Sequence, residues 1–315
     1  MFIGHFALSF LLIYFLLNVY TDVETKQVIR LSLISGIYGL VADLDIIFAF
    51  VETLLFVSET GNITIEAFWN ISRNFHRKST HSLVVGVLSI IGIVIQFIYI
   101  DDVAKPYENS TFDYGISILF GGLIGMLTGN FARGVLVSGL FVFCILSVTR
   151  VILYKTSFNK NIVLVSAFVG ILSHPFGDVF TGTPPNFFYP LYDINLERIV
   201  LFTNETLNIS ALFLIESLLF VLFMLIYADS KDINNNITYI TFFAAIASGG
   251  VLSYFITSPS IDEPYTFVSG ILLLTIGYII ITSYKRDVQY LFRAPIVSFL
   301  IGLGYFITTA SALSI

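Results

Sequence analysis

Long apolar stretches without charged residues restrict the fold of this chain more than any other feature of its sequence. A helix that crosses a bilayer needs about 20 predominantly apolar residues, and several segments reach that length with no charged side chain. Only 11% of the 315 residues are charged, whereas soluble domains contain about 25%. So few charges cannot form a water-facing shell. The sequence therefore predicts an all-α fold, a multi-pass bundle of about ten transmembrane helices in the lipid bilayer of the cell membrane.

The predicted spans are separated by short polar segments. They cover residues 2–20, 28–45, 81–99, 112–129, 134–154, 162–180, 209–228, 237–257, 265–283 and 294–313. Residues 46–57 are apolar but short, and Glu52 interrupts them. We therefore expect residues 46–57 to continue the preceding helix or to form an interfacial helix.

Residues 112–154 form an apolar stretch that is too long for one helix, and residues 130–133 are its only polar break. We therefore predict a tight helical hairpin. Small residues let two backbones approach closely in lipid, and the first arm of this hairpin has suitable glycines at Gly121, Gly122, Gly125 and Gly129.

Polar residues within the predicted spans lie mainly in the N-terminal half, and the last four spans contain almost none. We therefore predict a functional membrane domain at residues 1–195 and a C-terminal transmembrane bundle at residues 196–315. Of the 15 lysines and arginines, ten follow odd-numbered spans and five follow even-numbered spans. Because cytoplasmic loops carry the excess of these residues, we predict that the N-terminus lies on the outer face.

Several classes of protein and site are disfavoured. The first helix lacks a basic region and a small-residue cleavage site, so we expect it to be retained. The net charge of −6 and the lack of a basic run give no surface for nucleic acid. The single cysteine, Cys144, excludes an intrachain disulfide and a thiolate site of the Cys-x-x-Cys kind.

The histidines lie beside polar or acidic residues at predicted membrane boundaries; they are His5, His76, His81 and His174. Ionisable residues in spans are costly and indicate functional sites. His174 and Asp178 are four residues apart, so they share one helix face and could hold one ion together. Asp43 and Asp45 are two apart and would point apart on a regular helix, so we expect one of them to face the site.

The order of the predicted spans brings these residues to one membrane face. The first and third spans begin at the outer face, and the second and sixth end there. Imidazoles and carboxylates together favour zinc, with manganese or iron as alternatives. Taken singly, a histidine at a helix end is typical of packing, and a buried aspartate can pair with an arginine such as Arg77 or Arg133. Thr80 or Ser79 is expected to cap the third span.

The chain resembles a family of membrane-bound metal-dependent hydrolases, the YdjM-like group, some bacterial members of which are described as LexA-regulated. The resemblance covers about residues 1–195, through Gly4-His5, Ala42–Asp45, residues 76–82, residues 172–181 and Tyr189-Pro190. The family is distantly similar to zinc-dependent phospholipase C and to single-strand nucleases, which cut phosphate esters. The resemblance implies a divalent-metal hydrolase whose ligands are His5, Asp43 or Asp45, His81, His174 and Asp178.

This chain departs from the family pattern at two positions. Relatives often have proline before the first aspartate and histidine after the second, where this chain has Ala42 and Ile46. The phospholipase and nuclease proteins also have a later histidine cluster for another metal, whereas this chain has no histidine after His174. We therefore expect one or two ions rather than three. The resemblance also implies that His76 is a further ligand or supports one.

The leading hypothesis is hydrolysis of a phosphate-containing or lipid-linked ester through a metal-bound hydroxide. His76 and Arg77 are the candidate catalytic residues. Arg77 and Lys78 would stabilise developing charge or, as we favour slightly, serve as interfacial anchors. A lipid-like substrate would suit a site at the membrane face. The alternatives are a transporter, which needs ligands near the midplane and matched broken helices, and a scaffold with a non-catalytic metal site.

Overall fold

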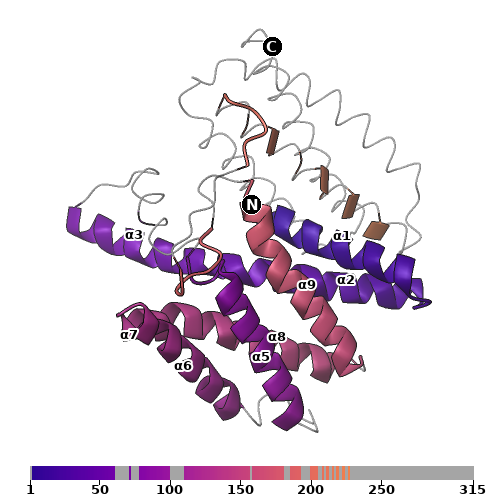
Figure 1. The fold of residues 1–315 in the computed structure, drawn as a ribbon, viewed down its shortest axis with the longest axis horizontal. Coiled ribbons are helices and arrows are strands. Elements are labelled where there is room, and N and C mark those ends of the chain that lie inside the picture. The colour runs from indigo at the N-terminus through magenta and orange to yellow at the C-terminus, as the bar shows by residue number, and fades with distance from the viewer. Residues whose placement is uncertain are drawn as a thin grey trace. The chain divides into compact units, whose positions relative to one another are not determined.

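The computed structural model is all-helical, and it describes residues 2–60, 71, 78–99, 110–156, 158–180, 185–192, 199–204 and scattered residues between 208 and 227 (Figure 1). The chain divides into two compact units, one formed by residues 4–198 with Phe2 and the other by residues 199–315 with Met1 and Ile3. The functional division at residue 195 stays a prediction. The last three predicted spans, which start at residue 237, lie outside the described residues.

The first unit is built from α-helices and two segments of other helical geometry. They are α1 (Phe2–Tyr20), α2 (Thr25–Val41), the 3-10 turn η1 (Ala42–Asp45), α3 (Ile46–Thr60), α5 (Leu83–Tyr99), α6 (Ser110–Leu127), α7 (Phe131–Arg133), the π-helical segment η2 (Gly134–Gly139), α8 (Leu140–Lys155) and α9 (Lys160–Asp178). Phe131–Lys155 and Lys160–Asp178 are long and apolar enough to cross a membrane, and three further apolar helices are shorter. The count of ten spans stays a prediction.

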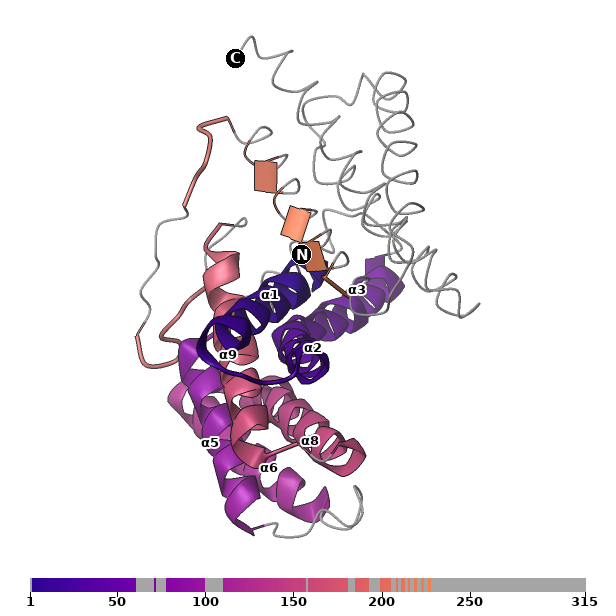
Figure 2. The same cartoon turned by 90° about the vertical axis from the view of Figure 1, so that its right-hand side faces the viewer.

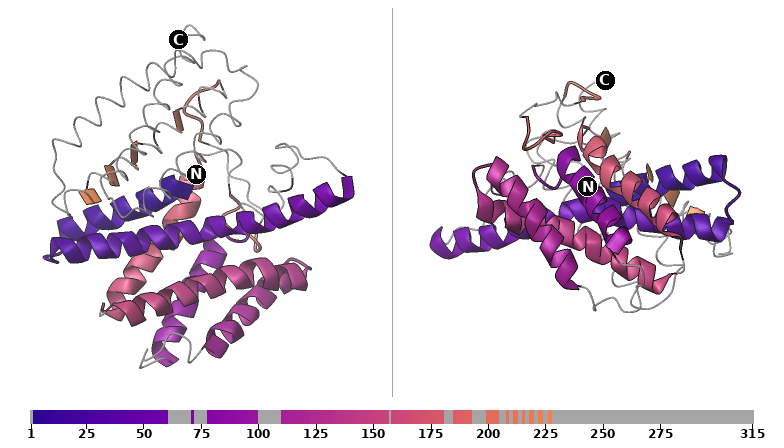
Figure 3. Two further views of the ribbon diagram at one scale, coloured as in Figure 1. Left: turned by 180° about the vertical axis from the view of Figure 1, so that it is seen from behind. Right: turned by 60° about the horizontal axis from the view of Figure 1, so that its bottom comes forward.

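Helices α1 and α2 lie side by side, and α2 continues through η1 into α3 as an almost straight rod (Figures 1 and 3). Ile13 and Leu17 of α1 pack against Val28 and Leu31 of α2. Of the two alternatives predicted for residues 46–57, a continuation of the preceding helix or an interfacial helix, the structure shows the continuation. The 3-10 turn tightens the backbone at Asp43 and Asp45, and both aspartates are buried there.

The predicted hairpin of residues 112–154 is confirmed by α6, α7, η2 and α8. The chain turns at Gly129, whose φ of 71° favours glycine. The Asn130 side chain then accepts a hydrogen bond from the Arg133 backbone N–H at 3.1 Å, which caps the returning helix. A Cβ atom on Gly121 would lie 2.7 Å from the Gly139 Cα atom, so the two arms touch through backbone.

Helices α5 and α9 run past the hairpin and past α2, and α9 carries the site residues of the C-terminal side (Figure 2). The core between these helices is apolar and includes Ile93, Phe120, Ile145 and Leu146. At the crossing of α2 and α9, a Cβ atom on Gly170 would overlap the Ser35 carbonyl oxygen. Glycine therefore brings the last turns of α9 close to the end of α2.

Candidate metal centre

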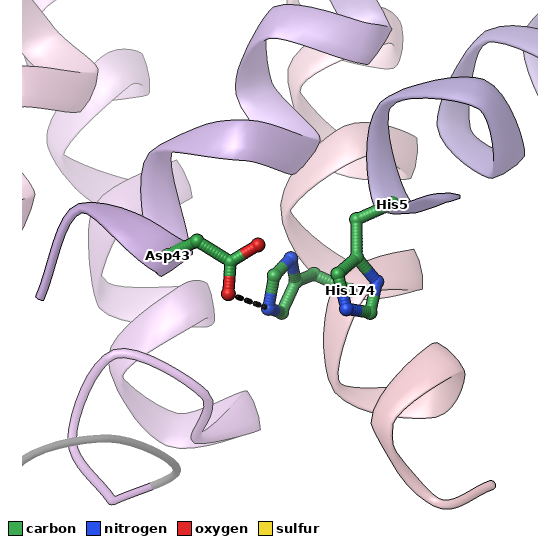
Figure 4. A group of neighbouring side chains, drawn as sticks. All are labelled: His5, Asp43 and His174. Atoms are coloured by element: carbon green, nitrogen blue, oxygen red, sulfur yellow. Dashed lines mark ion pairs between the residues drawn. The ribbon is translucent and has the colours of Figure 1, made fainter. Parts of the chain in front are cut away.

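The structure brings together six of the residues that the sequence singled out. His5 lies in the first turn of α1, Asp43 and Asp45 in η1, His81 just before α5, and His174 and Asp178 at the end of α9. Each is buried, with at most 4% of its surface exposed. Figure 4 shows His5, Asp43 and His174 approaching one another from three elements. The roles of these six residues as ligands stay a prediction.

The imidazoles present their Nε2 atoms to two carboxylates. Asp178 Oδ1 lies 3.2 Å from His5 Nε2, and Asp178 Oδ2 lies 3.2 Å from His81 Nε2 and 3.6 Å from His174 Nε2. Asp43 Oδ1 lies 3.5 Å from the Nε2 atoms of both His81 and His174. In a tetrahedral zinc site with bonds of about 2.0–2.1 Å, two ligand atoms are about 3.3–3.4 Å apart. The observed spacings therefore suit ligands that converge on one ion.

Two buried atoms of the cluster strengthen this fit. Asp43 Oδ2 and His174 Nε2 have no hydrogen-bond partner among the described residues. Leaving such a group unsatisfied in a protein interior costs about 1–3 kcal/mol, which a bound cation would offset. The donors are imidazole nitrogens and carboxylate oxygens, a set that fits zinc, manganese or iron.

The chain offers two overlapping ligand sets, each with its ligand atoms within 4.8 Å of one another. One set contains His5, Asp43 and His174, and the other contains His81, His174 and Asp178. His174 belongs to both. Its Nδ1 lies 2.6 Å from the Gly39 carbonyl oxygen, and because a carbonyl only accepts, Nδ1 carries the proton. His174 therefore has one nitrogen, Nε2, for an ion.

Small residues make room for His5. A Cβ atom on Gly177 would lie 2.9 Å from two atoms of the His5 ring, and a Cβ atom on Gly39 would overlap the Ser9 Oγ atom. Ser9 in turn donates a hydrogen bond to the His5 carbonyl at 2.8 Å and contacts Ser173 Oγ at 2.8 Å. These contacts attach the start of α1 to the end of α9.

Thr80 is a site residue that sequence reasoning missed. Its hydroxyl donates a hydrogen bond to Asp45 Oδ2, and its Oγ1 lies 2.8 Å from His81 Nδ1. The expectation that Thr80 or Ser79 caps the following helix is wrong, because the Ser82 Oγ atom accepts from the Val84 N–H at 3.1 Å. Adjacency to His81 was the one sequence signal that could have pointed to Thr80.

The segment after α9 packs over the start of α5. Leu83 N–H donates to the Phe187 carbonyl at 2.9 Å, and the Ser82 hydroxyl donates to the Tyr189 carbonyl. The predicted catalytic residues His76 and Arg77 lie outside the described residues, whereas Lys78 is described and exposed. An exposed lysine thus lies two residues from the buried Thr80.

Similarity to known proteins supports a membrane family. The chain matches the family model described as YdjM inner membrane protein over residues 1–284, a range that contains all six clustered residues. Comparisons with curated proteins and with solved structures give no match. Membership of an inner membrane family agrees with the apolar helices and implies association with a lipid bilayer. Because the match extends over most of its length, the chain belongs to the YdjM inner membrane protein family.

Proposed function

We propose that this chain is a membrane hydrolase that requires a divalent metal and acts on a phosphate-containing or lipid-linked ester. The observation that carries the proposal is the convergence of three imidazoles on the carboxylates of Asp43 and Asp178, at N–O distances of 3.2–3.6 Å in a buried site. Burying these groups together is costly unless a cation compensates for them.

The residues of the cluster would bind the metal ion and hold one another's side chains in position. His81, His174, Asp43 and Asp178 would hold the metal, and His5 would complete the set. Asp178 presents one oxygen to His5 and the other to His81, so it also fixes two rings relative to each other. When bound, a divalent metal supplies Lewis-acid chemistry that acidifies water and polarises an ester oxygen.

Zinc is the metal we favour, with manganese or iron as alternatives, and one or two ions are expected. Because both ligand sets need the single available nitrogen of His174, the first ion would use His174 and a second would bind without it. The site is built from helix ends, and the exposed Lys78 lies close to it in sequence. This location suits a substrate with an anionic head group that approaches from the membrane boundary.

The test combines metal analysis with hydrolysis. Detergent-purified protein is analysed for metal content beside the double variant His174→Ala/Asp178→Asn, with Asp22→Asn as a control because Asp22 is an exposed acidic residue. We expect one or two ions per chain in the wild type and the control, loss of the ions in the double variant, and hydrolysis of phosphoester lipids only in metal-loaded protein. Absence of stoichiometric metal after reconstitution, or full activity in the double variant, would contradict the proposal.

A scaffold with a structural metal is the second candidate, and the burial of all six residues favours it. A structural site has a closed coordination sphere, whereas a catalytic site keeps a position open. Adding azide to cobalt-loaded protein separates the two candidates, since azide changes the cobalt absorption spectrum only where a position is open. The transporter alternative gains no support from the described residues, whose candidate ligands lie at helix ends.

A further inference from the structure

Asp43 and Asp45 lie on opposite edges of the His81 ring. Asp43 Oδ1 is 3.5 Å from Nε2, and Asp45 Oδ2 is 3.5 Å from Nδ1. On a regular α-helix, residues two apart point in different directions, but the 3-10 turn η1 buries both carboxylates beside one imidazole. The two aspartates therefore face different nitrogens of one imidazole.

The hydrogen bonds around Thr80 determine which nitrogen of His81 carries the proton. The Thr80 hydroxyl has one proton and donates it to the Asp45 carboxylate. The Thr80 oxygen can then only accept at its 2.8 Å contact with His81 Nδ1. Nδ1 of the neutral ring is therefore protonated, and the lone pair lies on Nε2, which faces Asp43 and Asp178.

We propose that Asp45 and Thr80 are positioning residues that act through His81, and that Asp45 is not itself a metal ligand. The relay from Asp45 through Thr80 holds the His81 ring in the tautomer and orientation in which Nε2 can bind an ion. The proposal deepens the function proposed above, because the bound ion it concerns is the one in that site. Partners of this kind on metal-binding histidines commonly contribute about 10–100-fold in metal affinity.

His174 is held in the same tautomer by a different acceptor. Its Nδ1 donates to the Gly39 backbone carbonyl, which no side-chain substitution removes. His81 depends instead on two side chains, so its relay can be broken and restored by mutation. Thr80 suits this task because a hydroxyl donates and accepts at once, and valine has the same shape without either property.

The experiment uses two pairs of variants in the full chain. Thr80→Val and Asp45→Ala each break the relay, whereas Thr80→Ser keeps the hydroxyl and Asp45→Asn keeps an oxygen acceptor. Zinc affinity is measured by competition with a chelator, and the cobalt-loaded spectrum reports ligand geometry. We expect Thr80→Val and Asp45→Ala to weaken affinity by about 10–100-fold with unchanged stoichiometry, and the conservative variants to lose less than tenfold. Asp43→Asn, at a direct ligand, should reduce the stoichiometry itself.

A second measurement requires no metal. Nitrogen-15 NMR of histidine-labelled, metal-free protein distinguishes the two tautomers at a pH high enough for the imidazole rings to be neutral, and with four histidines in the chain the His81 signal can be assigned by substitution. We expect the Nδ1-protonated form in the wild type and in Thr80→Ser, and a mixture in Thr80→Val. This signature would stand even if the protein bound metal without hydrolysing any ester, so a failure of the proposed function is distinguishable from a failure of the relay.

Three results would overturn the relay. The first is zinc affinity in Thr80→Val equal to that of the wild type. The second is loss of an ion from the stoichiometry in Asp45→Asn, which would make Asp45 a ligand. The third is an unchanged His81 tautomer in both Thr80→Val and Asp45→Ala. Gel-filtration profile and helical circular dichroism establish that each variant is folded, and if Thr80→Val does not fold, Thr80→Ala removes the same hydroxyl and tests the relay in its place.

Discussion

His5 lies in the candidate metal centre beside the end of α9, and Gly177 leaves the space that its ring occupies. The rings of His5 and His174 have centroids 3.8 Å apart and are tilted by 31°. His5 is thus confined between the imidazole of His174 and the backbone at Gly177, and its Nε2 faces Asp178. The position of one candidate ligand therefore depends on a residue that has no side chain.

We predict that Gly177→Ala weakens metal binding without unfolding the protein. The added Cβ atom would lie 2.9 Å from His5 Cε1 and Nδ1, so the ring must leave its present position beside Asp178. Alanine is otherwise favoured over glycine in a helix interior by about 1 kcal/mol, so a general loss of helix stability is not expected. Zinc competition should show a loss of affinity of about tenfold or more, as for other changes that disturb a ligand's support.

Gly115→Ala is the matched control for this prediction. No atom lies within 4 Å of the position that its Cβ atom would occupy, so the same chemical change meets no steric obstacle. Its zinc affinity should equal that of the wild type. If Gly177→Ala binds zinc as tightly as Gly115→Ala, then His5 either is not a ligand or relaxes without cost.

Among single residues, the sequence predicts which ones gather at the candidate site but not how they lie relative to one another within it. His174 and Asp178 could be paired because helical periodicity relates residues four apart. The distinct positions of Asp43 and Asp45 around His81 depend on the 3-10 turn, which the apolar pattern does not reveal. Threonine and serine are common at helix caps, so the sequence offers Thr80 or Ser79 as the cap, whereas the partners of Thr80 are Asp45 and His81.

At the scale of helices, a buried ionic cluster joins α5, α6 and α8 away from the metal centre. Arg150 Nη2 and Nε lie 2.7 and 2.8 Å from Asp113 Oδ2, and Gln96 Nε2 donates to Asp113 Oδ1 at 2.9 Å. All three residues are at most 3% exposed. Charges inside an apolar bundle are tolerated when they are paired and hydrogen-bonded, and this cluster links the three helices through such contacts.

We predict that Arg150→Met destabilises the protein strongly while the double variant Arg150→Met/Asp113→Leu destabilises it less. Removing one partner of a buried pair leaves an uncompensated charge and costs about 3–5 kcal/mol, whereas replacing both with apolar residues is often nearly neutral. Thermal or denaturant unfolding in detergent measures the difference. Equal losses in the two variants would contradict the pairing, and folded fractions of both should keep the metal content of the wild type.

The hairpin of α6 and α8 was easier to predict from the sequence than the path of the chain from α2 into α3. The hairpin of α6 and α8 could be predicted because its polar break and glycines are local signals, and both have the expected roles. The continuation of α2 into α3 was one of two alternatives, because Glu52 and the short apolar length fit either an extension or an interfacial helix. The structure shows the extension, with η1 between the two helices and its two carboxylates buried beside His81.

At the scale of the whole molecule, the face of the membrane on which the site lies determines which substrates can reach it. The excess of lysine and arginine in the loops after odd-numbered spans predicts that the N-terminus, and with it the metal centre, lies on the outer face of the inner membrane. Each predicted face of the membrane has an exposed lysine that the structure describes. Lys78, close in sequence to the site residues Thr80 and His81, is predicted on the outer face, and Lys26, at the start of α2, on the cytoplasmic face.

We predict that a membrane-impermeant maleimide labels Lys78→Cys, but not Lys26→Cys, in intact spheroplasts. Each variant is made in a Cys144→Ser background, so that the introduced thiol is the chain's one cysteine. Lysis before labelling should make Lys26→Cys reactive and provides the control for intrinsic accessibility. The opposite pattern would reverse the orientation and direct substrate screening to esters of the cytoplasmic leaflet. It would leave the metal prediction intact, because the cluster depends on which helix ends meet and not on the side of the membrane they face.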